Sequence, residues 1–361
     1  MEASRRLYRW EQGLLRSGTA AYGYSEASFL VLDPAFMEII NEESTLELLA
    51  EADAHEGGVY NPEDDCVYFS SSRQTDPKPN AQIMKVHLAT GKVEVVKSET
   101  EVANGMVLGK DGALLVCNQG IRPHGGFIEH LNLKTGESKV LIDNWYGRRF
   151  NSPNDVVVKS DGSIWFTDPD YAWVQGFGAE PEVKNHVYRL SPSGVVDAVA
   201  DGFVKPNGLA FSPDESLLYV TDTGSTIGDG TVDIQKPHSV TVIDVDENGA
   251  SLKNKRHFAS IATIVEPKYE GVGCPDGIKV DTEGRVYIAN LDGVQVFDKK
   301  GKLLGMIKIP GATNMGFAGR DLQTLVILNG TAIYKITLSA KGAGLTGQVC
   351  TQKPKSRKAH C

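Results

Sequence analysis

"NGLAFSPDESLLYVTDTG", residues 207–224, predicts two short strands joined by a turn. A polar residue and a glycine open the first strand, Pro213-Asp214 mark the turn, and the second strand is richer in β-branched and aromatic residues. The same pattern recurs along the chain, which makes the stretch one copy of a repeat. The clearest other copies are "NGMVLGKDGALLVCNQG" (104–120), "NDVVVKSDGSIWFTDPD" (154–170) and "DGIKVDTEGRVYIANLDG" (276–293).

Two weaker copies bring the number of units to six: "HEGGVYNPEDDCVYFSSS" (55–72) and "NMGFAGRDLQTLVILNG" (314–330). A second hairpin follows the first in each unit, as in "HVYRLSPSGVVDAVA" (186–200). Four strands in each repeated unit are typical of a β-propeller blade. A βαβ fold would need helical patterns between the strands, and the sequence lacks them.

The sixth unit stops one strand short, after "AIYKITL" (332–338). The segment "TLELLAEA" (45–52) can supply the missing outer strand and remove the open sheet edges. The sequence therefore predicts an all-β, six-bladed β-propeller whose ring is closed by an N-terminal strand that completes the last blade. We assign residues 1–40 to an N-terminal extension, 41–340 to a single propeller domain, and 341–361 to a C-terminal tail.

Composition and charge exclude several classes of protein. The net charge of −9 argues against a general nucleic-acid binder, which needs a basic face. No run of apolar residues is long enough to span a membrane, and the N-terminus lacks the apolar core of a signal peptide. The five cysteines have no metal-ligand spacing, so we expect reduced thiols and a cytoplasmic protein. The basic end "KPKSRKAHC" is expected to be solvated.

The first residues of the six inner strands are all oxygen donors: Glu56, Asn104, Asn154, Asn207, Asp276 and Asn314. Inner strands line the channel of a propeller, so these residues should form a ring at one mouth. Carboxylates crowded together are costly to bury without a cation, and carboxylates with amides suit Ca²⁺ better than Zn²⁺. The alternative is that these residues, often followed by glycine, only make turns.

Other motifs carry less weight. "GAGLTG" (342–347) matches a dinucleotide-binding pattern by chance, because no βαβ unit surrounds it. The chain has no G-x-S-x-G nucleophile elbow and no H-E-x-x-H zinc motif. His55 and His124 are interpreted as surface or packing residues. Tyr171 and Trp173, in "DPDYAWVQGFG", would either wall a substrate pocket or cap the third blade.

Four stretches resemble the SMP-30/gluconolactonase/luciferin-regenerating family, and within it the fungal lactonohydrolases: "DNWYGRRFNSPNDVVV" (143–158), "SIWFTDPDYAW" (163–173), "KPNGLAFSPDESLLYVTDTG" (205–224) and "CPDGIKVDTEGRVYIAN" (274–290). The resemblance runs from about residue 28 to about 338. It implies a six-bladed propeller with one catalytic divalent cation, usually Ca²⁺, with Zn²⁺, Mg²⁺ or Mn²⁺ as alternatives. Carried over by motif, the metal ligands are Glu56, Asn154, Asn207 and Asp276.

The resemblance also implies that Asn104 lines the substrate site. As a ligand next to an open metal position, Asp276 is the best candidate to orient or deprotonate the attacking water. Asp168 and Asp222 end the second strands of their blades and would support the ligands from behind, or they are ordinary strand-end residues. The loop "NQGIRPHGGF" (118–127), which contains Arg122, is predicted to shape the substrate pocket together with "FGAEPEVKNH" (177–186).

Three functions remain open at this point. The leading hypothesis is a metal-dependent hydrolase that opens a lactone or related ester, with a small-molecule substrate and neither nucleic acid nor membrane as a partner. The chain lacks a signal peptide, so an intracellular role on a larger, apolar lactone is one version of it. The second is a pocket recruited for a non-hydrolytic step such as cyclisation, condensation or cycloaddition. The third is a non-enzymatic binding propeller, which would be favoured if side chains plugged the mouth.

Overall fold

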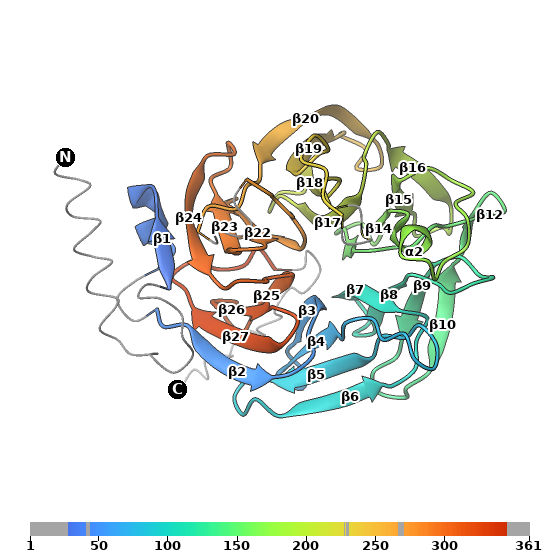
Figure 1. The fold of residues 1–361 in the computed structure, drawn as a ribbon, viewed down its shortest axis with the longest axis horizontal. Coiled ribbons are helices and arrows are strands. Elements are labelled where there is room, and N and C mark those ends of the chain that lie inside the picture. Colours follow the sequence, from blue (N-terminus) through green and yellow to red (C-terminus); the bar gives the residue numbers. More distant parts are fainter. Residues whose placement is uncertain (1–27, 41–43, 227, 229–230, 266–270, 345–361) are drawn as a thin grey trace, which may run out of the picture.

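Six antiparallel sheets surround a central axis in the computed structural model, which describes residues 28–40, 44–226, 228, 231–265 and 271–344 (Figure 1). The sheets follow one another along the chain, and each begins at the axis with its first strand. This confirms the predicted six-bladed β-propeller.

Each blade is built as the repeat predicts, from two consecutive hairpins. The first three blades contain β3 (Glu56–Asn61), β4 (Cys66–Ser70), β5 (Ile83–His87), β6 (Val93–Lys97); β7 (Ala103–Leu108), β8 (Leu114–Asn118), β9 (Phe127–Leu131), β10 (Ser138–Ile142); and β13 (Val156–Val158), β14 (Ile164–Asp168), β15 (His186–Leu190), β16 (Val196–Ala200). A two-stranded ribbon, β11 (Asn144–Trp145) and β12 (Arg148–Arg149), lies between the second and third blades in sequence.

The last three blades repeat the arrangement. They contain β17 (Pro206–Phe211), β18 (Leu217–Asp222), β19 (Ser239–Val245), β20 (Leu252–Ser260); β21 (Ile278–Val280), β22 (Val286–Asn290), β23 (Gly293–Phe297), β24 (Leu303–Lys308); and β25 (Asn314–Ala318), β26 (Thr324–Leu328), β27 (Ala332–Thr337). The described part of the chain has one short α-helix, α2 (Tyr171–Val174), in the third blade.

The ring closes through β2 (Glu47–Glu51), which pairs antiparallel with β27 and completes the sixth blade. The two ends of the propeller therefore share one sheet, as the sequence predicts. In this arrangement β2 pairs with the outer edge of β27, so the chain segment that leads into the first blade also belongs to the sheet of the last blade.

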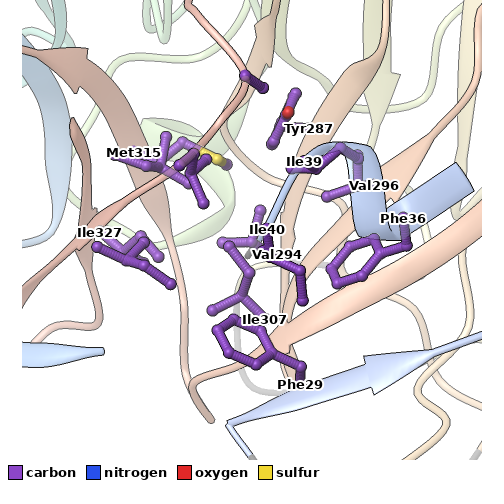
Figure 2. Packing of buried hydrophobic residues seen from close by; sticks show 14 of the residues in the cluster. Phe29, Phe36, Ile39, Ile40, Tyr287, Val294, Val296, Ile307, Met315 and Ile327 are labelled. Atoms are coloured by element: carbon purple, nitrogen blue, oxygen red, sulfur yellow. The ribbon is translucent and has the colours of Figure 1, made fainter. Parts of the chain in front are cut away.

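The segment before β2 packs onto the fifth blade, although it lies in the predicted N-terminal extension. β1 (Phe29–Val31) adds a fifth strand by pairing with β24, and the 3₁₀ helix η1 (Pro34–Glu38) follows it. Figure 2 shows four apolar side chains of this segment gathered with residues of the fifth and sixth blades, where all four are buried: Phe29, Phe36, Ile39 and Ile40. The segment thus extends the core between these two blades.

Burial falls from the axis outward, and this explains the composition of the strands. The innermost strands β3 and β7 are buried at every position, whereas the outermost strands β6 and β10 are largely exposed or half-buried. Within each blade the first strand begins, and the second strand ends, at the same end of the propeller. Residues at these two places therefore gather at one mouth of the channel.

Two of the sequence expectations touch regions that the structure describes only in part. Cys66 and Cys117 are buried, Cys274 is half-buried and all three are free thiols, while Cys350, Cys361 and tail residues 345–361 lie outside the described residues. In the part of the chain described above, no helix is long and apolar enough to cross a membrane. The cytoplasmic location stays a prediction.

Candidate functional site

A cavity of about 400 Å³ opens at the channel mouth where the inner strands begin. Five of the six ring residues predicted from sequence line it: Glu56, Asn104, Asn154, Asn207 and Asp276. They come from five different blades, so only closure of the ring brings them together. The mouth is therefore not plugged by side chains, so the observation that would have favoured a binding propeller is not made.

Three oxygens in this cavity are buried without a hydrogen-bond partner among the described residues: Oδ1 of Asn104, Oδ1 of Asn154 and Oδ1 of Asp276. Unpaired buried oxygens are costly, and three of them in one cavity suit an electropositive ligand. The described residues hold no group of three or more His, Cys, Asp or Glu placed for a metal. The donor set is instead two carboxylates with amides, which fits a hard cation that prefers oxygen ligands.

The two carboxyl groups of the site, Glu56 and Asp276, lie within hydrogen-bonding reach of each other, and Asn207 also reaches Asp276. Burial raises the pKa of Glu56 strongly, and the nearby charge of Asp276 raises it further. Burial likewise raises the pKa of Asp276 to about 7. The charge of Asp155 adds to the rise for Asp276, whereas its hydrogen bonds with Glu56 and Asn207 oppose it. A divalent cation held by the two carboxylates would lower the pKa of both.

The residue that ends the second strand of a blade holds the backbone just before the ring residue. Asp168 accepts from the N–H groups of Asn151 and Ser152 at 2.9 and 2.8 Å. Asp222 accepts from the N–H groups of Val204 and Lys205 at 3.0 and 2.8 Å. Asn118 and Asn290 make the equivalent bond in the second and fifth blades. Asp168 and Asp222 thus bond to the backbone that leads to Asn154 and Asn207, while their role in supporting metal ligands stays a prediction.

Consecutive blades are also joined through the ring residues themselves. Thr167 donates its hydroxyl to the carbonyl of Asn207 at 2.6 Å, and Thr221 donates to the carbonyl of Asp276 at 2.9 Å. The glycine that follows the ring residue permits this close approach, since a Cβ on Gly208 would lie 2.5 Å from the Asp276 carbonyl oxygen. The Asn-Gly pair at 207 and 208 thus lies inside a strand and not in a turn.

The predicted substrate-binding residues divide into two groups. Tyr171, at the start of α2, lines the cavity together with Asn104, and burial raises the pKa of its phenol well above the usual value. Arg122 and Trp173 do not line it. The Arg122 guanidinium lies 5.6 Å from the Trp173 ring and its Nε donates to the Gly178 carbonyl at 2.6 Å, in the loops beside the mouth.

His55 lies in the cavity wall, with its Nδ1 3.9 Å from Glu56 Oε1, and its side chain is 39% exposed. Its interpretation as a surface or packing residue stays a prediction. His124 is exposed, as expected.

Several polar residues of the wall escaped the sequence analysis: Arg73, Gln119, Gln175, Thr223, Thr226 and Cys274. They come from loops that follow second strands or precede inner strands, and loop residues carry no periodic signal. Burial raises the pKa of the Cys274 thiol to about 12, so it is a neutral thiol and not a nucleophilic thiolate. The many polar side chains favour a polar ligand over the large apolar lactone considered above.

A family model described as SMP-30/Gluconolactonase/LRE-like region matches residues 54–331, which include every ring residue. The chain belongs to this SMP-30/gluconolactonase/LRE-like family. The match begins two residues before Glu56 and ends within the sixth blade, so it spans the whole set of inner strands.

Several members of the family resemble the chain over most of its length. A gluconolactonase of Zymomonas mobilis is 34% identical over 62% of this chain, and the match spans 60% of that protein's length. The lactonohydrolase oryL of Aspergillus oryzae is 28% identical over 80% of this chain and 69% of its own. The solved structure of XC5397, a gluconolactonase from Xanthomonas campestris, is 31% identical with a TM-score of 0.70, covering 86% of this chain and 94% of that one.

Proposed function

We propose that this family member is a divalent-metal-dependent hydrolase that opens a lactone, with Ca²⁺ as the expected ion and Zn²⁺, Mg²⁺ or Mn²⁺ as alternatives. The observation that carries the proposal is the set of unpaired oxygens on Asn104, Asn154 and Asp276 in one cavity with Glu56. The names of the Zymomonas, Aspergillus and Xanthomonas relatives support the reaction class.

Glu56, Asn154, Asn207 and Asp276 would hold the cation. Four protein oxygens leave further positions open for water and substrate, because Ca²⁺ accepts six to eight oxygen ligands. When bound, the ion would polarise the lactone carbonyl and stabilise the oxyanion that forms on it.

The protein groups supply positioning and proton transfer. Asp276 would accept a proton from water as the water oxygen bonds to the carbonyl carbon. The bond between that carbon and the ring oxygen then breaks, the proton passes to the departing oxygen, and a hydroxy acid results. Asn104 and Tyr171, which line the same cavity, would orient the lactone ring.

Acid release from a panel of lactones tests this proposal. We expect chelation to abolish activity, added Ca²⁺ to restore it, and Asp276→Ala to remain inactive in either condition. In isotopically labelled water the product carboxylate should gain one labelled oxygen. Activity that survives both chelation and Asp276→Ala would overturn the proposal, and a product without label would favour the non-hydrolytic alternative.

A further inference from the structure

Arg73 presents a positive charge to the cavity wall without a carboxylate to balance it. The residue lies in the loop after β4, and it lines the cavity together with Glu56 and Asp276. Within the described ranges, no Asp or Glu oxygen lies within 4.0 Å of its guanidinium. Burial lowers the pKa of Arg73 from its ordinary value, and no acidic group offsets that cost. The side chain nevertheless stays charged, as arginine does in proteins.

The guanidinium is held in place by an aromatic ring from another blade. Its central carbon lies 4.5 Å from the centre of the Phe177 ring, a cation–π contact. Phe177 is only 6% exposed and packs in a small cluster with Ala81, Val102 and Ala172. A loop of the third blade therefore positions the charge carried by a loop of the first.

The loop that carries Arg73 is itself restrained on both sides of the residue. Ser72 N–H donates to Asp53 Oδ1 at 2.9 Å, and the backbones of Gln74 and Asn80 exchange two hydrogen bonds of 2.7 and 3.0 Å. A restrained, unpaired guanidinium loses little conformational entropy when it binds a ligand.

The charge balance of the cavity indicates the kind of ligand. A divalent cation would balance the two carboxylates of Glu56 and Asp276. The nearby buried Asp155 has Lys279 as its own counter-charge, so the charge of Arg73 would remain uncompensated. Arginine pairs with carboxylates through two parallel hydrogen bonds, which gives both affinity and orientation. We place this substituent away from the reacting carbonyl, since no hydrogen bond or ion pair among the described residues joins Arg73 to the ring of oxygen donors.

We propose that Arg73 is a specificity-determining residue that binds a carboxylate substituent of the substrate, so that the substrate class is an acidic lactone. The inference rests on the proposed lactonase function. It differs from the expectation of an apolar lactone, and it assigns a role to a residue outside the predicted metal and substrate ligands.

A matched pair of lactones tests the inference: a γ-butyrolactone carrying a carboxylate, and the same compound with a neutral carboxamide. We expect the wild type to prefer the carboxylate. Arg73→Met should lower kcat/KM for the carboxylate compound about 100-fold, mainly through KM, and for the carboxamide less than about threefold. For the carboxylate compound, kcat/KM of Arg73→Lys should lie between the values of the wild type and Arg73→Met, because lysine keeps the charge but loses the planar fork.

Arg320→Met is the control, because Arg320 is an exposed arginine in the turn between β25 and β26, at the opposite end of the blade from the mouth. Arg320→Met should leave kcat/KM unchanged for both lactones. Equal losses on both lactones in Arg73→Met, or a wild type without preference, would overturn the inference. If Arg73→Met does not fold, as judged by thermal melting, the decision rests on Arg73→Lys.

Calorimetric titration with glutarate, a simple dicarboxylate, separates this inference from the proposed function. We expect the Ca²⁺-loaded wild type to bind glutarate at least about tenfold more tightly than Arg73→Met does, and neutral glutaramide to bind both proteins equally weakly. A wild type that hydrolyses no lactone but shows this difference would refute only the reaction. Equal glutarate binding by the two proteins would overturn the role of Arg73 whatever the reaction is.

Discussion

Asn314 donates a hydrogen bond from its side-chain amide to Glu56 Oε2 at 2.6 Å. Its own Oδ1 accepts from the Met315 N–H at 2.8 Å and lies 3.3 Å from Lys279 Nζ. Two donors on Oδ1 fix the orientation of the amide, so its N–H₂ group must face Glu56. The sixth residue of the ring therefore holds the carboxylate of the first, and Glu56 Oε1 would be the oxygen that faces the proposed cation.

Replacing Asn314 by leucine, which has nearly the same shape, should release Glu56. We expect the Ca²⁺ affinity to fall by about 10- to 100-fold, as is usual when a group that orients a metal ligand is lost. Calorimetric titration of the metal-free protein measures this. Asn248→Leu, in the exposed turn between β19 and β20, is the control. Unchanged affinity in Asn314→Leu would show that Asn314 does not orient Glu56.

Glu56→Gln should have opposite effects on the metal-free and metal-loaded protein. Burial and the charge of Asp276 raise the pKa of Glu56, so its ionised form destabilises the metal-free fold, and a neutral amide should raise that melting temperature. The same change should weaken Ca²⁺ binding by more than about 100-fold, since it removes an anionic ligand and not merely its support. Glu56→Gln should therefore melt at a higher temperature than the wild type in chelator, and at a lower temperature than the wild type in Ca²⁺. A variant that gains stability from Ca²⁺ as the wild type does would contradict the ligand role.

Asp168→Ala should lower Ca²⁺ affinity, an effect that loss of a similar carboxylate elsewhere in the fold should not have. Asp298 makes a matched control, because it also accepts two backbone N–H bonds, from Lys300 and Lys302 at 2.8 and 2.9 Å, in the turn between β23 and β24. Each alanine variant should lose about 1–3 kcal/mol of unfolding free energy. Only Asp168→Ala should also lower Ca²⁺ affinity, by about 10-fold or more. Similar Ca²⁺ affinities in the two variants would reduce Asp168 to a strand-end residue.

Gly208→Ala should disturb the junction between the fourth and fifth blades. The new Cβ would lie 2.5 Å from the Asp276 carbonyl oxygen and 3.0 Å from the Ile278 nitrogen, and these are backbone atoms that cannot move aside cheaply. We expect a loss of about 2 kcal/mol or more of unfolding free energy, together with reduced activity. Gly136→Ala, which meets open space at φ +75°, should cost only about 1 kcal/mol and leave activity intact. Chemical denaturation measures the unfolding free energy of both variants. Equal losses would mean that Gly208 is not needed for the close approach of the two blades.

Much of the architecture could be predicted because the propeller repeats one local pattern. The strand, turn, strand sequence around Asn207 recurs around Asn154 and Asp276, and equal patterns place equal positions at the same mouth. The strand at 47–51 was also predictable, since the sixth unit lacks its outer strand. The packing of residues 29–40 on the fifth blade was not, because a short apolar segment has no partner within its own sequence neighbourhood.

The sequence by itself determined the fold, the family and the ring of oxygen donors, because each depends on short-range patterns that every blade repeats. Only the tertiary structure decided how the members of that ring differ. Asn314 turns its amide nitrogen inward because Met315 and Lys279 occupy its oxygen, and Arg73 faces the cavity because Phe177 of another blade supports it. These roles depend on side chains that come into contact only when the ring closes, and no local sequence pattern encodes such contacts.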